Sequence, residues 1–250
     1  MKALQVARFG AAYALVWLFS ASASAVGFEP TVTIDVENPE QSISLDQLGA
    51  LSNTDTEIVT WQLESPMDGD GFRVHTWDAD LKADPFVTNN LHVTNTTNGV
   101  QTFTAEVGLT IPDFAYDSVV ASSFGVTVTD SDGSGSASLG MSGSIPIYQG
   151  QVNNGALTLL VLNSAVLPVA CFNPGCSTFG GNQQAFLAVA SGIADHIGLV
   201  LTFTLSPGDS AALTSRFEIV PEPGPFALVA MGLFGLGAFA RRSRGRTAQR

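Results

Sequence analysis

Acidic side chains and glycines gather in a short stretch whose residue types could bind a hard divalent cation. Residues 130–135 read Asp-Ser-Asp-Gly-Ser-Gly. Oxygens of Asp130, Asp132 and Ser134 hold the first, third and fifth places of a calcium-binding loop, and a glycine holds the sixth. Met141 stands at the twelfth place, where such loops carry a glutamate. Calcium is therefore the cofactor that this stretch could bind, and ordinary turn chemistry is the alternative.

A second acidic stretch, residues 68–71, opens in the same way as Asp-Gly-Asp-Gly. Phe72 and Ala79 fill its fifth and twelfth places, where a calcium loop needs oxygen ligands. Asp68 and Asp70 nevertheless begin the densest acidic patch of the chain. Carboxylates from neighbouring loops can converge on one cation, so both residues are further calcium candidates.

Patterns typical of enzymes are sparse in this chain. The histidines His75, His92 and His196 are scattered, and neither His-Glu-x-x-His nor Gly-x-Ser-x-Gly occurs. His75 could form an acid–base pair with Asp78 or Asp80. We expect a protein that is not an enzyme and has no catalytic residues, and a hydrolase is the third hypothesis.

Two tryptophans are candidates for stacking on a sugar ring. Trp61 shares its side of the alternation with Leu63, which predicts a core position. Trp77 shares its side with Arg73 and His75, which predicts an exposed ring. A carbohydrate-binding module, assisted by calcium or not, is therefore the second hypothesis for the function.

Apolar and polar residues alternate through much of residues 26–219, as in strands with one buried and one solvent-facing side. The clearest run is 103–111, from Phe103 to Ile111. This pattern predicts one all-β domain over residues 26–219, built as an antiparallel β-sandwich or a jelly-roll-like form of it.

Turn and capping residues predict how the strands connect. Asn98-Gly99 and residues 206–210 stand between alternating runs, so we expect a hairpin at each. Ser44 and Gln47 form a capping box, which predicts one short helix over residues 45–51.

Cys171 and Cys176 are the two cysteines, and Phe-Asn-Pro-Gly separates them. An Asn-Pro-Gly turn brings such cysteines close together, so we expect a small disulfide in an oxidising compartment. No histidine lies nearby, which argues against zinc.

Charge is distributed unevenly along the chain. Of 22 acidic residues 21 lie within residues 26–220, but only three of the ten basic residues do, which gives about −18 there against −12 for the whole chain. Such a charge repels nucleic acid and acidic polysaccharides. We expect no nucleic-acid partner, and a sugar partner that is neutral or bridged by divalent cations.

The last thirty-one residues have three parts. Residues 220–225 read Val-Pro-Glu-Pro-Gly-Pro, residues 226–240 are uncharged and largely apolar, and five of the last ten residues are arginines. The prolines predict an extended spacer. The apolar part predicts a helix of roughly 22 Å, short of the roughly 30 Å hydrocarbon core, which suits a temporary anchor. The basic part, residues 241–250, should stay in the cytoplasm. Its stop signal is formed by Arg241, Arg242 and Arg244.

This order of parts resembles the PEP-CTERM sorting tail of exported bacterial proteins. The resemblance covers the tail alone. It implies a sorting motif of Val220, Pro221, Glu222 and Pro223, an exosortase-type membrane protease that recognises Pro-Glu-Pro, and a Gram-negative cell that produces exopolysaccharide.

The other end of the chain predicts a signal peptide over residues 1–25. Lys2 and Arg8 precede an apolar stretch, and Ala23-Ser24-Ala25 forms a small-x-small cleavage site before Val26.

Together these features predict an exported, non-enzymatic envelope or extracellular-matrix protein, linked to exopolysaccharide or biofilm. Its body would lie outside the cytoplasm during a transient stay in the inner membrane. It would then reach the cell surface or the matrix.

Overall fold

The computed structural model describes residues 30–37, 40–44, 49–53, 58–82, 85–114, 118–153, 155–160, 175–189 and 193–221. This part of the chain is all-β, as predicted. The predicted signal peptide, the cleavage site at Ala23, Ala25 and Val26, and the tail from Glu222 onward lie outside the described residues. The described part contains no helix of the length and apolar character that crossing a bilayer requires.

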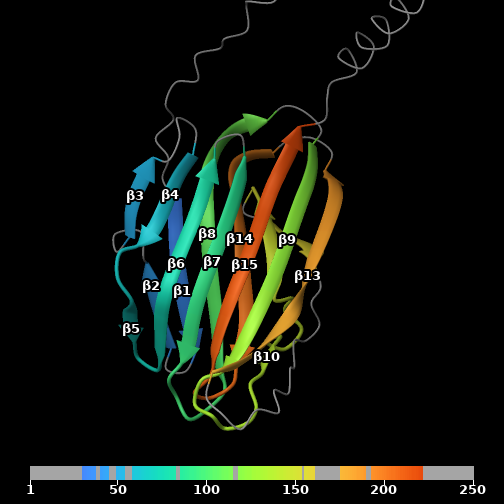
Figure 1. Cartoon of the computed structure of the whole chain (residues 1–250). Coiled ribbons are helices and arrows are strands. Elements are labelled where there is room, and N and C mark those ends of the chain that lie inside the picture. Colours follow the sequence, from blue (N-terminus) through green and yellow to red (C-terminus); the bar gives the residue numbers. More distant parts are fainter. Residues whose placement is uncertain are drawn as a thin grey trace, which may run out of the picture.

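The described strands form two antiparallel sheets that pack face to face (Figure 1). The seven-stranded sheet has the order β12-β11-β14-β8-β1-β2, and β10 pairs with β14. Its strands are β1 (Pro30–Glu37), β2 (Glu40–Ser44), β8 (Gln101–Phe114), β10 (Leu139–Gly140), β11 (Tyr148–Val152), β12 (Gly155–Leu160) and β14 (Ile193–Leu205).

The eight-stranded sheet lies in front in Figure 1 and has the order β13-β9-β15-β7-β6-β4-β3, with β5 paired to β6. Its strands are β3 (Gly49–Asn53), β4 (Ile58–Leu63), β5 (Met67–Gly69), β6 (Phe72–Lys82), β7 (Phe86–Asn95), β9 (Ser118–Asp130), β13 (Cys176–Val189) and β15 (Ser210–Pro221).

One core fills the space between the sheets, because inward-facing residues alternate with outward-facing ones along the strands. In β9 the alternation of buried and half-buried residues is unbroken over thirteen positions. Phe72 of β6 meets Phe103 of β8 edge to face at 6.1 Å, and Phe124 of β9 lies 5.9 Å from Tyr148 of β11. Since both pairs join opposite sheets, aromatic contacts hold the two layers together.

Neither predicted hairpin forms. Asn98-Gly99 connects β7 to β8, and residues 206–210 connect β14 to β15, so each segment carries the chain from one sheet to the other. Turn residues specify that the chain reverses, but they do not specify whether the next strand pairs with the last one.

Buried Asn95 lies between these two crossovers. Its side-chain amide donates to the carbonyl oxygens of Gly99, Leu205 and Ser206 over 2.7, 3.0 and 3.1 Å. One side chain thus holds the β7–β8 and β14–β15 connections together at this end of the fold.

The predicted helix over residues 45–51 is wrong at residues 49–51, the part of it that the structure describes. Residues 49–51 belong to β3, which pairs with β4, and residues 45–48 lie outside the described residues. Pairing along β4 outweighs the local capping preference.

Trp61 is buried, as predicted, but the prediction of an exposed Trp77 is wrong. The register of β6 against β7 shifts between Val74 and Thr76, so one extra residue stands in β6. This bulge reverses the alternation, and Trp77 is 1% exposed with its Nε1 donating to Asn89 Oδ1 over 2.5 Å.

The described chain starts and finishes at the same end of the sheets. Pro30 pairs with Leu109, which pairs with Ile197, far from the 206–210 crossover. Pro221 pairs with Ser118, at the end of β15 opposite Ser210. We call this the terminal end. The opposite end, which carries the β7–β8 and β14–β15 crossovers, is the distal end.

Candidate functional site

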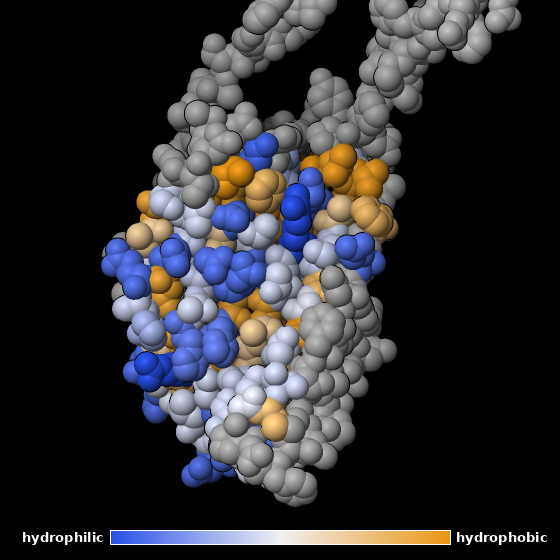
Figure 2. Space-filling view, in the orientation of Figure 1, coloured by the Kyte–Doolittle hydropathy of each residue, from blue (hydrophilic) through white to orange (hydrophobic). Residues whose placement is uncertain are grey.

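A groove of about 550 Å³ opens on the outer face of the eight-stranded sheet, at the distal end. Figure 2 shows this face, with hydrophilic residues gathered over its lower left part. Four strands and two loops contribute the lining residues, which are Arg73, His75, His92, Thr94, Thr129, Ser131, Asp132, Gly208 and Ser210.

Two histidine rings form one wall of the groove. His75 is the extra residue of the β6 bulge, and the bulge turns its ring toward β7. The ring stacks on that of His92 with centroids 4.5 Å apart. His75 Nε2 also forms a 2.8 Å hydrogen bond with Thr94 Oγ1.

Both imidazoles favour the neutral form. Burial lowers the pKa of His75, and the neighbouring Arg73 guanidinium lowers it further. Burial also lowers the pKa of His92, with His75 as the second cause. The pair can therefore donate and accept hydrogen bonds at neutral pH without carrying charge.

The hypothetical acid–base pair of His75 with Asp78 or Asp80 is not assembled. Asp78 accepts a hydrogen bond from the Asn90 side chain, and Asp80 accepts one from Thr60 Oγ1. His75 instead faces Thr94 and His92.

Three carboxylates meet beside the groove. One oxygen from each of Asp130, Asp132 and Asp209 lies within 4.8 Å of the other two. Asp130 ends β9, Asp132 belongs to the loop that follows, and Asp209 belongs to the β14–β15 crossover. The three carboxylates come from two segments about eighty residues apart in the sequence. The crossing of the chain between the sheets brings these segments together.

Asp130 organises the loop after β9. Its Oδ1 accepts hydrogen bonds from the amides of Gly133 and Ser134 over 2.8 and 3.2 Å, and its Oδ2 accepts one from Gly135 over 2.8 Å. Asp132 Oδ1 accepts a second one from the Ser134 amide, also over 2.8 Å. These bonds fold the loop so that both carboxylates face the crossover.

Asp209 is buried in the crossover. Ser206 Oγ donates to its Oδ2, while its Oδ1 is buried with no hydrogen-bond partner in the described part of the chain. Burial raises the pKa of Asp209, and the neighbouring charges of Asp132 and Asp130 raise it further. The Ser134 amide, by contrast, lowers the pKa of exposed Asp132.

No family model matches this chain, and neither does any curated protein. The chemistry of the groove and its carboxylates is therefore inferred from their geometry.

The residues of the first predicted calcium stretch come together in part. The carboxylates of Asp130 and Asp132 converge. Ser134 instead donates its backbone amide to Asp132, and its hydroxyl donates to the Ser136 carbonyl over 3.1 Å. The partner that the sequence interpretation missed is Asp209. It stands in a Pro-Gly-Asp turn that resembles any hairpin turn, and no local signal relates it to Asp130.

The second predicted calcium pair lies apart from these carboxylates. Asp68 forms an exposed ion pair with Arg73 at 3.5 Å. Asp70 is exposed, and its backbone amide donates to Gln41 over 3.1 Å.

The remaining predicted sites lie at the edge of the described part or beyond it. Val220 is exposed near the end of β15, and Pro221 is the last residue of that strand. Cys176 is disulfide-bonded, and its predicted partner Cys171 lies outside the described residues. The stop residues Arg241, Arg242 and Arg244, together with Glu222 and Pro223, also lie outside them.

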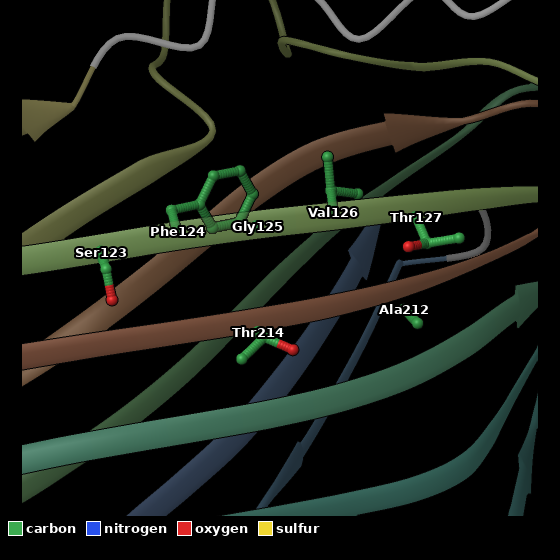
Figure 3. Close-up of a pocket in the computed structure, with 7 residues that line it drawn as sticks. All are labelled: Ser123, Phe124, Gly125, Val126, Thr127, Ala212 and Thr214. Carbon is green, nitrogen blue, oxygen red and sulfur yellow. The ribbon is translucent and has the colours of Figure 1, made fainter. Parts of the chain in front are cut away.

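A second, smaller hollow of about 230 Å³ lies on the same face at β9 and β15. Figure 3 shows Phe124 and Val126 on one side of β9 and Ser123 and Thr127 on the other. Gly125 has no side chain to fill the space between the latter two. None of the residues that line this hollow has an acidic or basic side chain, so hydroxyls are its polar side-chain groups.

Proposed function

We propose that this chain is an exported, non-enzymatic protein of the bacterial envelope or extracellular matrix, sorted through its Pro-Glu-Pro tail. The observation that carries the proposal is the position of β15. This strand pairs with β7 and β9 and continues to Pro221, the first proline of the motif. The tail therefore begins where a central strand leaves the sheet.

The geometry gives the two ends of the fold different roles. Eleven residue steps separate Ser210 from Pro221, which at about 3.3 Å per residue is roughly 36 Å. While the tail resides in the inner membrane, the groove at the distal end would face away from the lipid. An exosortase-type membrane protease would act on the tail during this stay, and exopolysaccharide would be the later partner at the cell surface.

We also propose that the two sheets form a jelly-roll-like β-sandwich. Consecutive strands of the described part change sheet seven times, at β2–β3, β7–β8, β8–β9, β9–β10, β12–β13, β13–β14 and β14–β15, and repeated passages of this kind support a jelly-roll-like sandwich.

The proposal is tested by the intact mass of the product that cells release. We expect a species that begins at Val26 and lacks the terminal arginines. A Glu222→Gln variant should stay in the membrane fraction with its arginines attached. Glu218→Gln is the matched control, since Glu218 lies four residues earlier and pairs with Arg216 at 2.8 Å. A released species that still carries Arg250 would refute the proposal.

A carbohydrate-binding module is the second candidate, and the groove favours it. Arg73, the two histidines, Ser131 and Ser210 supply donors and acceptors suited to sugar hydroxyls. The buried Trp77 removes the predicted stacking platform, so hydrogen bonding would dominate. His92→Ala should weaken glycan binding, whereas Asn90→Ala, two residues earlier on the same face, should leave it unchanged. Equal glycan binding by both variants would exclude the groove as the binding site.

A further inference from the structure

We infer that Asp130, Asp132 and Asp209 bind one calcium ion, which joins the loop after β9 to the β14–β15 crossover. This inference concerns the distal end alone, so it stands or falls independently of the sorting tail.

The spacing of the carboxylates fits one shared cation. Calcium binds oxygens at about 2.3–2.6 Å, so two oxygens on opposite sides of one ion lie about 5 Å apart. The three carboxylate oxygens lie within 4.8 Å of one another. One ion can therefore contact all three.

The buried oxygen of Asp209 is the independent observation that indicates a ligand. Asp209 has no exposed surface, and its Oδ1 has no hydrogen-bond partner among the described residues. A buried carboxylate oxygen without a partner costs a protein stability unless a cation or a donor satisfies it. Burial raises the pKa of Asp209, whereas the Ser206 hydroxyl and the Ser131 amide lower it by hydrogen bonding. The two further carboxylates nearby cannot donate when they are ionised.

Protein cations do not neutralise the three carboxylates in the described part of the chain. Arg73 is the basic side chain of the neighbouring groove, and its ion pair is with Asp68. Like charges at this separation repel one another, and a bound divalent cation would reverse that repulsion.

The loop is built to leave lone pairs free for an ion. Asp130 Oδ1 accepts hydrogen bonds from two backbone amides, whereas its Oδ2 accepts one. Asp132 Oδ2 lies directly above Gly208, where an added Cβ would stand 2.5 Å from it. A glycine at this position lets the loop approach the crossover closely.

The donor set selects the class of metal. All three ligands are carboxylate oxygens, and no cysteine or histidine belongs to the cluster. Hard cations such as calcium prefer these ligands, whereas zinc and copper prefer nitrogen and sulfur. Water would supply the remaining coordination positions.

The test is titration of the full-length chain in detergent, stripped with EDTA, with CaCl₂ as the sole added metal. Calorimetry should detect one site, and extracellular modules of this kind bind at about 0.1–1 mM. At about ten times the dissociation constant, the melting temperature should rise by about 3–5 °C.

Three variants decide between the site and a general charge effect. Asp209→Asn and Asp132→Asn should each abolish the calcium-dependent shift, because each removes one charged ligand. Asp70→Asn removes the same charge outside the cluster and should keep the full shift. Asp132 is exposed, so its variant serves even where Asp209→Asn fails to fold.

Two results would overturn the inference. One is the absence of calcium binding by the stripped protein at about 1 mM, the weak end of the range for extracellular modules. The other is an equal calcium shift in all four proteins, which would place the ion elsewhere.

Discussion

The backbone amide of Asn95 donates to the carbonyl oxygen of Asp209 over 2.9 Å, and this bond joins the β7–β8 crossover to the β14–β15 crossover. The side chain of Asn95 continues the link through its bonds to Gly99, Leu205 and Ser206. The residue has no exposed surface. The distal end is thus a hydrogen-bonded unit.

Replacing Asn95 with alanine should destabilise the protein by about 2–4 kcal/mol, because the buried carbonyl of Leu205 and the part-buried carbonyl contacts at Gly99 and Ser206 lose this donor. Denaturant unfolding measures the loss. Asn98→Ala is the control, since Asn98 is exposed in the same crossover and should change stability by less than about 0.5 kcal/mol. Similar losses in both variants would contradict a special role for Asn95.

Two glycines with positive φ allow the cost of backbone strain to be measured separately from the cost of a steric contact. Gly208 has a φ of 72° and an added Cβ there would meet Asp132, whereas Gly143 has a φ of 61° and open space around it. Both alanine variants incur the left-handed strain, of about 1–2 kcal/mol. Gly208→Ala should cost at least about 1 kcal/mol more, because Asp132 must also move. Thermal unfolding of the two variants in EDTA gives the comparison, and equal losses would contradict the contact.

The histidine pair predicts how stability changes between about pH 7 and pH 5. The pKa of each histidine is lowered in the folded state, so the unfolded chain takes up protons at a higher pH than the folded one does. Stability should therefore be full above the ordinary pKa and fall as the pH drops through it. A His75→Gln/His92→Gln double variant should show a smaller fall between midpoints measured at pH 7 and pH 5. A residual slope is expected because burial also lowers the pKa of His196. An unchanged slope would refute the assignment.

Without bound metal, Asp209 should contribute a pH dependence of stability that is opposite in sign to that of the histidines. Its pKa is raised in the folded state, so its contribution is lost as the pH rises through that pKa, and the ionised carboxylate destabilises the fold at pH 7. In EDTA at pH 7, Asp209→Asn should be at least as stable as the wild type, and its advantage should shrink near pH 4. Denaturant midpoints at both pH values test this. A variant that is less stable than the wild type at pH 7 would show that the charge of Asp209 is already compensated.

Local sequence patterns predicted the strands but not how they connect. Alternation identified runs such as 103–111, because apolar residues fill the inward positions of that run. The same rule failed at Trp77, since a bulge adds one residue and leaves no signature in composition. Whether Asn98-Gly99 closes a hairpin or a crossover depends on long-range pairing, which turn residues do not encode.

Two of the three carboxylates of the candidate site were predictable from the local sequence. Asp130 and Asp132 belong to one loop whose spacing indicates calcium chemistry. Asp209 arrives from a distant turn, and its proximity follows from the crossing of the chain between sheets. A cluster assembled across sheets cannot be found by searching for motifs along one segment.

The central position of β15 has a mechanical consequence. Neighbours flank this strand on both sides, with β9 paired along its whole length up to Pro221. A pull on the chain at Pro221 would act along the strand axis and strain both rows of hydrogen bonds at once, instead of opening them one after another. The protein should therefore withstand drag from flowing liquid or a stretched matrix better than one fastened through an edge strand.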